Sequence, residues 1–124
     1  MPIPREMDKV GSFYERMANF LTPIAGFLDL TEAKFREDVN TMWKSLLEKH
    51  KKWKEGSLEK EEFLNVLDKS HKTIEGIRKK ITEMEGSKNL NKKEFDELKE
   101  GSLKSIENAI NKIKETQKVI AKLK

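Results

Sequence analysis

The two histidines of this 124-residue chain, and the carboxylates near them, are the residues with the clearest potential for chemistry. Asp68 stands three residues before His71, a spacing that puts both side chains on one helical face and would let them share a metal ion. Helical di-metal sites use such a pair from each of two helices plus two further carboxylates, but Leu47 stands three residues before His50. The sequence therefore predicts no metal site and no cofactor, and favours His71 as a half-buried member of a polar layer.

Nucleophilic catalysis has equally little support in the sequence. The chain contains no Cys, which excludes a thiol nucleophile, an iron–sulfur cluster and a disulfide. Asp68, Ser70 and His71 would share one helical turn, where a serine nucleophile and its histidine base point past one another. The sequence has no glycine-rich phosphate-binding motif. We therefore expect a non-enzymatic protein without catalytic residues, and we infer no small-molecule substrate.

The densest run of positive charge lies between residues 49 and 54. It forms a candidate anion-binding site made of Lys49, Lys51, Lys52, Trp53 and Lys54. A nucleic-acid base could stack on the Trp53 ring, or a lipid head group could rest there. The same lysines are also favoured in the last turn of a helix, where cations complement the helix dipole, and Trp53 falls on an apolar stripe. An accessory role in binding nucleic acid or another anionic surface is the alternative functional hypothesis.

The longest stretch without charge is Met17–Leu28, which carries bulky apolar residues on more than one helical face. A helix that is apolar all round must be covered on all sides. The cover is either the rest of this domain or an interface with another subunit or a partner protein. The residues that would anchor such an interface are Phe20, Leu21, Ile24, Phe27 and Leu28. The leading hypothesis is thus a non-enzymatic protein–protein interaction or scaffolding module that can self-associate.

Helices must position these residues, and three helical segments share a start signal. A Leu is followed five residues later by a Phe in three pairs: Leu30 and Phe35, Leu58 and Phe63, and Leu90 and Phe95. This is the spacing of a hydrophobic staple, in which the residue before the N-cap packs on the fourth helical residue. Each pair therefore predicts the beginning of a helix.

Capping residues mark the same boundaries. Thr31 is a favourable N-cap, Asn91 forms a capping box with Glu94, and Ser57 is a better cap than Glu59 for the helix between them. At the other ends, basic residues precede Gly56 and Gly86, as is typical of helix C-termini.

Two prolines and one glycine qualify this pattern. The first helix is expected to begin near Pro4, since proline is tolerated in a first helical turn. Pro23 lacks an amide donor and restricts Thr22, so we expect a kink or short break there. The last helix either continues through Gly101 or breaks at this residue, because an interior glycine is tolerated at a cost.

Between these boundaries the apolar residues repeat with heptad spacing. The cleanest seam consists of Phe63, Leu67, Ser70, Ile74, Ile77, Ile81 and Met84. Similar stripes run through residues 35–53 and 95–123, and they are wide enough for a helix to have two neighbours. We predict one all-α domain over residues 1–124: an elongated up-down-up-down four-helix bundle with short loops, its first helix kinked at Pro23.

Composition limits the partners and the location of this domain. Against 26 Lys and Arg stand 22 Asp and Glu, a net charge of +4 that falls short of a dedicated nucleic-acid-binding chain. No uncharged run approaches the roughly 20 residues of a membrane span, and the opening residues do not resemble a secretory leader, so a cytoplasmic protein is expected. The Lys and Glu excess resembles that of proteins from hot environments, although AT-rich coding bias would give the same lysines.

Overall fold

The computed structural model describes the backbone of residues 3–28, 33–86 and 90–123, and the side chains of these residues except Lys9 and residues 20–35. Four helices account for most of this chain: α1 (Asp8–Leu28), α2 (Ala33–Glu55), α3 (Lys60–Glu83) and α4 (Lys92–Ala121). No strand occurs in these three ranges. The prediction of an all-α fold with four helices is confirmed.

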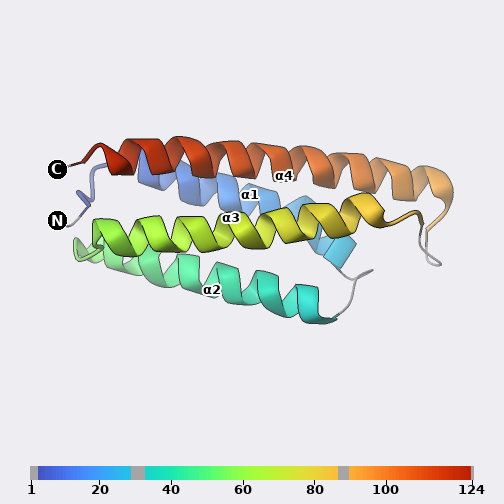
Figure 1. Ribbon diagram of the computed structural model, residues 1–124, viewed down its shortest axis with the longest axis horizontal. Coiled ribbons are helices and arrows are strands. Elements are labelled where there is room, and N and C mark those ends of the chain that lie inside the picture. Colours follow the sequence, from blue (N-terminus) through green and yellow to red (C-terminus); the bar gives the residue numbers. More distant parts are fainter. Residues whose placement is uncertain (1–2, 29–32, 87–89, 124) are drawn as a thin grey trace.

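Successive helices run in opposite directions along an elongated molecule, with α3 between α2 and α4 in the view of Figure 1. Lysine side chains fasten α3 to α4 at both ends. At one end, Lys99 Nζ donates to the carbonyl oxygens of Thr82 and Met84, at 3.1 and 2.7 Å. At the other, Lys60 Nζ donates to the carbonyl oxygens of Ala121 and Leu123, at 3.2 and 2.7 Å. The start of each helix is thus tied to the end of the other, which fixes an antiparallel pair.

The core follows the predicted seams. Every seam residue within α3 is buried, whereas Met84, just beyond the end of the helix, is half-buried. The α4 helix buries its own stripe from Phe95 to Ile120. Phe13 of α1 meets Phe63 of α3 edge to face, with ring centroids 5.7 Å apart. Each fully buried side chain of this size contributes roughly 1.5–3 kcal/mol to stability, so these stripes are the main stabilising element. None of the described helices is both long and apolar enough to span a membrane.

The expectation that α1 begins near Pro4 was wrong, because the helix begins at Asp8. The preceding residues are tied to the turn between α2 and α3 instead. The amide of Ile3 donates to the carbonyl oxygen of Leu58 at 2.8 Å, and the carbonyl oxygen of Pro4 accepts a hydrogen bond from Trp53 Nε1 at 2.9 Å. These contacts hold the chain in a turn, and buried Ile3 anchors it to the core.

The helix termini agree in part with the capping signals. Asn91 caps α4 as predicted, since its side-chain oxygen accepts a hydrogen bond from the amide of Glu94 at 2.8 Å. The N-cap of α3 is Glu59, which makes no side-chain capping bond. Ser57 does not replace it, because its hydroxyl donates at 3.3 Å to the carbonyl oxygen of Lys52 at the end of α2. The Thr31 cap lies outside the described residues.

Glycines at three boundaries behave differently. Gly56 ends α2 with φ +76°, a conformation that favours glycine. The prediction that α3 ends at Gly86 was wrong, because the helix stops at Glu83 and Met84 is already extended. The uncertainty at Gly101 is resolved, since α4 continues through it. Along α1 the helix also continues through Pro23 without a break, and a kink there stays a prediction.

Candidate functional site

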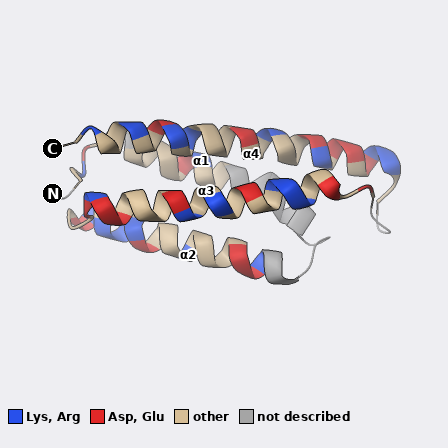
Figure 2. Ribbon diagram, viewed as in Figure 1, with Lys and Arg blue, Asp and Glu red and all other residues tan. Residues whose placement is uncertain are grey.

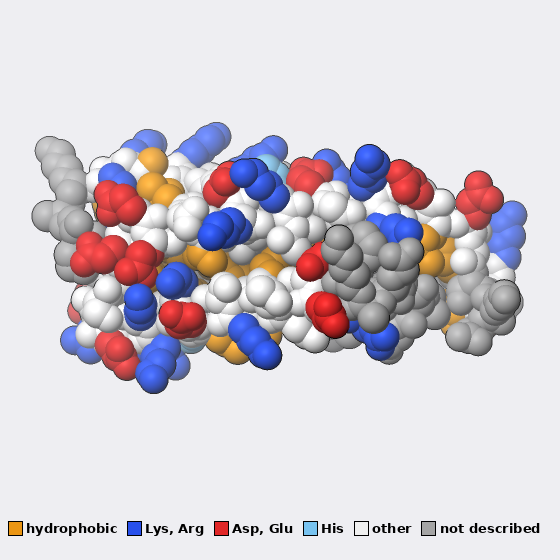
Figure 3. Space-filling view, turned by 60° about the horizontal axis from the view of Figure 1, so that its bottom comes forward, with side chains coloured by type: hydrophobic (Ala, Val, Ile, Leu, Met, Phe, Trp, Pro, Cys, Tyr) orange, Lys and Arg blue, Asp and Glu red, His pale blue; other side chains and the backbone are white. Residues whose placement is uncertain are grey.

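A trough in the described surface lies between α2 and α3, and we call it the α2–α3 groove. Its main part has a volume of about 370 Å³, and a second hollow of about 170 Å³ continues it toward Lys49 and Glu62. Figure 3 shows hydrophobic side chains in a hollow that extends along the long axis of the molecule between these two helices. Its volume falls within the range of ligand pockets, roughly 300–1,000 Å³.

The groove is lined by small hydroxyl side chains above a buried floor. Thr41 and Ser45 of α2 stand on one side and Thr73 of α3 on the other, while buried Met42 and Val66 provide apolar surface. Because Thr and Ser are short, the space above Met42 and Val66 stays open. Sequence reasoning missed this groove, since residues of these types look like an ordinary polar helix surface.

Ser70 lies among the lining residues and is 2% exposed. Its hydroxyl has no hydrogen-bond partner among the described residues. A buried hydroxyl left without a partner costs roughly 1–3 kcal/mol.

The walls of the groove carry opposite charges. Asp38 and Glu48 stand on α2, whereas Lys69 and Lys72 stand on α3. Where the groove narrows toward its far end, Lys49 Nζ of α2 pairs with Glu62 Oε2 of α3 at 3.4 Å. The pattern gives an acidic wall and a basic wall along most of the groove.

The predicted anion-binding cluster is divided between several structural contacts. Lys49 and Lys52 both pair with Glu62, the latter at 3.0 Å. The hydrogen bond from Lys52 lowers the pKa of Glu62, and the same bond raises the pKa of Lys52. Trp53 is half-buried and is held by the Pro4 carbonyl. Of the five predicted residues, only Lys51 and Lys54 have side chains that make no such contact within the described chain.

An aromatic stack joins α1 to α2 beside this cluster. The His50 ring contacts Tyr14 in a tilted arrangement and stacks on Trp53, with centroid distances of 4.3 and 5.5 Å. Burial and the nearby Lys54 charge lower the pKa of His50. Burial also raises the pKa of Tyr14, whose hydroxyl lacks a partner in the described part of the chain. The stack is therefore a structural contact that holds uncharged rings.

The Asp68 and His71 pair is not assembled into a metal site. His71 Nε2 lies 3.3 Å from Glu75 Oε1, while Asp68 pairs with Lys72 at 3.2 Å. Among the residues that the structure describes, no group of three or more His, Asp or Glu side chains could hold a metal ion.

The predicted partner-binding anchors belong to the second half of α1. The side chains of Phe20, Leu21, Ile24, Phe27 and Leu28 lie outside the described residues. On α2, Trp43 is half-buried and Leu47 is 45% exposed. Leu47 is the exposed large hydrophobic residue of the described surface.

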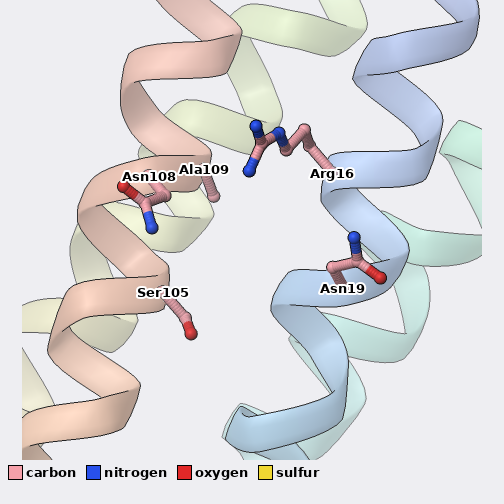
Figure 4. Close-up of a pocket in the computed structure, with 5 residues that line it drawn as sticks. All are labelled: Arg16, Asn19, Ser105, Asn108 and Ala109. Carbon is pink, nitrogen blue, oxygen red and sulfur yellow. The ribbon is translucent and has the colours of Figure 1, made fainter.

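A smaller polar hollow of about 60 Å³ lies between α1 and α4. Figure 4 shows Arg16 of α1 extending toward Asn108 and Ala109 of α4, with Asn19 and Ser105 nearby. Its volume has room for only a few water-sized groups.

Comparison with known proteins adds no relative. No family model matches the chain, and neither the curated proteins nor the solved structures contain a match to it.

Proposed function

We propose that the protein is a non-enzymatic interaction module that binds a protein partner through the second half of α1 and the adjoining side of α2. The observation that carries this proposal is the exposure of Leu47 beside half-buried Trp43. Exposed apolar surface next to an aromatic anchor is typical of protein–protein interfaces.

The antiparallel course of α1 and α2 supports placing the two apolar segments together. His50 of α2 contacts Tyr14 of α1, which identifies the side of α2 that faces α1. Leu47 and Trp43 precede His50 by three and seven residues, so they continue this side of α2. Because α1 and α2 are antiparallel, Leu47 and Trp43 lie on the side of His50 that is nearer to the uncharged Met17–Leu28 stretch of α1. One helical pair thus presents both candidate segments.

Binding to nucleic acid or another anionic surface receives less support. Lys49 and Lys52 are already paired with Glu62. If Lys51 and Lys54 made two phosphate contacts, the logarithm of affinity would change with the logarithm of salt concentration with a slope of only about −2. Figure 2 shows positive and negative residues interspersed along α3 and α4.

Site-specific crosslinking in the cells that make this protein tests the proposal. A photoreactive amino acid replaces Leu47, and in a matched control it replaces Asn111, which is exposed on α4. We expect a discrete protein adduct from position 47 and none from position 111. Equal adducts at both positions, or none at either, would contradict the proposal. An adduct with a second copy of the chain would identify self-association, and an adduct with nucleic acid would favour the alternative.

A further inference from the structure

We propose that the α2–α3 groove is a second docking site, which takes an amphipathic helix of a protein partner with one acidic edge and one basic edge. Ser45 and Leu47 are two residues apart on α2 and therefore point to nearly opposite sides of the helix. The groove is thus separate from the Leu47 surface and does not depend on the function proposed for it.

The shape of the groove suits a helix. Two antiparallel helices form its walls, and the hollow extends from Asp38 and Thr73 to Glu48 and Asn65. The 11 residues from Asp38 to Glu48 span about 16 Å of helix. Helices that dock in such grooves insert apolar side chains spaced three or four residues apart. Met42 and Val66 give those side chains an apolar surface to cover.

The charges of the walls define the edges of the occupant. Lys69 and Lys72 would attract an acidic edge. Asp38 would attract a basic edge, with a smaller contribution from Glu48, whose Oε1 lies 4.0 Å from Lys49 Nζ. Within the described side chains, Asp38 and Lys69 form no ion pair. Lys72 is paired with Asp68, but both side chains are exposed and this pair contributes little.

The wall charges also set the direction of the docked helix. If a docked helix is turned by 180° within the groove, so that its N- and C-termini change places, each of its edges then faces the opposite wall. An occupant with one acidic and one basic edge therefore has one favoured direction, whereas exchanging the edges of the occupant reverses that direction.

Designed peptides test these requirements. Three stapled helical peptides of roughly 14 residues, about 21 Å long, share one inner strip of Leu, Ala and Gln. Each peptide has two edges. The first peptide carries Glu on one edge and Lys on the other, the second carries Lys on both edges, and the third carries Glu on both edges. At low ionic strength we expect the Glu and Lys peptide to bind the protein about fivefold more tightly than the others, as two exposed ion pairs imply. In the variant Lys69→Glu with Lys72→Glu both walls are acidic, and the Lys and Lys peptide should become the tightest binder.

The binding site of the peptide is checked with a matched pair of variants. Ser45→Phe fills the groove, whereas Asn111→Phe adds the same ring on α4. Circular dichroism establishes that both variants fold. We expect Ser45→Phe to weaken the Glu and Lys peptide at least tenfold and Asn111→Phe to leave its affinity unchanged. A nitroxide at the N-terminus of the Glu and Lys peptide should broaden the amide NMR signals of the protein at one end of the groove. In a fourth peptide, whose Glu and Lys edges are exchanged, it should broaden the signals at the other end.

Several results would overturn the inference. These are equal affinity for the three peptides, no binding at millimolar concentration, an affinity that Ser45→Phe does not change, and a nitroxide position that does not depend on the edges. If the protein alone forms dimers that Ser45→Phe dissociates, the occupant is a second copy and the proposed helical partner is wrong. None of these outcomes bears on crosslinking from position 47.

Discussion

Among single residues, Tyr14 combines a well-packed ring with an unmatched hydroxyl. The ring lies 6.3 Å from that of Phe63 in a parallel stack and 5.3 Å from that of Phe13. The hydroxyl is buried and has no hydrogen-bond partner in the described ranges. Tyr14→Phe keeps the ring contacts and removes the unsatisfied oxygen, so we expect the free energy of unfolding to rise by about 1 kcal/mol. Urea denaturation measures this change, and a decrease of similar size would show that the hydroxyl has a partner.

The contribution of His50 to the stability of the protein depends on pH. Because burial and Lys54 lower its pKa in the folded protein, the unfolded chain binds the proton more readily. The stability that neutral His50 contributes is therefore complete above its unfolded pKa of about 6.5 and is lost as the pH falls through the lower folded pKa. The groups around the ring are Tyr14 on α1 and Trp53 and Lys54 on α2.

Urea denaturation at pH 7.5 and pH 5.0 tests this dependence. Wild type should lose more stability between these pH values than His50→Phe, which keeps an aromatic ring in the stack. Equal losses would mean that His50 titrates alike in the folded and unfolded states. Carboxylates such as Glu62, whose pKa is lowered by Lys52, are present in both proteins and cancel in the comparison.

For the elements, Gly101 is the position where the local preference and the observed helix disagree. It lies within α4 and is exposed, and apart from its chain neighbours and the backbone of its own helix it has no described atom within 4 Å of the place where a Cβ would stand. Gly101→Ala should therefore raise the free energy of unfolding by about 0.5–1 kcal/mol. Thermal unfolding followed by circular dichroism measures the change.

Gly56 is the matched control for this prediction. Its φ of +76° is unfavourable for alanine, so Gly56→Ala should lower the melting temperature rather than raise it. If both substitutions shifted the melting temperature in the same direction, the assignment of one glycine to a helix interior and the other to a helix end would be wrong.

Some features of the helices could be predicted from the sequence and others could not. The seam from Phe63 to Ile81 and the Asn91 cap follow from local spacing, and the structure confirms both. The start of α1 could not be predicted, because it depends on the Ile3 amide and the Leu58 carbonyl, which are far apart in the sequence. The pairing of Lys49 and Lys52 with Glu62 likewise depends on how the α2–α3 turn aligns two helices.

For the whole molecule, short connections and wide apolar stripes were enough to predict a bundle of four helices. The α2–α3 groove could not be predicted in the same way. It arises where Thr41 and Ser45 of one helix come opposite Thr73 of another, and only the packing of the helices shows that this space stays open. The two proposed docking surfaces thus differ in origin, since uncharged sequence indicates one and the packing of the helices creates the other.

The function we propose for the whole molecule is the binding of a protein partner on the side formed by α1 and α2. It is tested most directly by the affinity of the partner captured at position 47 for wild type, Leu47→Glu and the control Asn111→Glu. We expect Leu47→Glu to weaken binding at least tenfold, about 1.4 kcal/mol, and Asn111→Glu to bind as wild type does. Equal affinities for wild type and Leu47→Glu would contradict it.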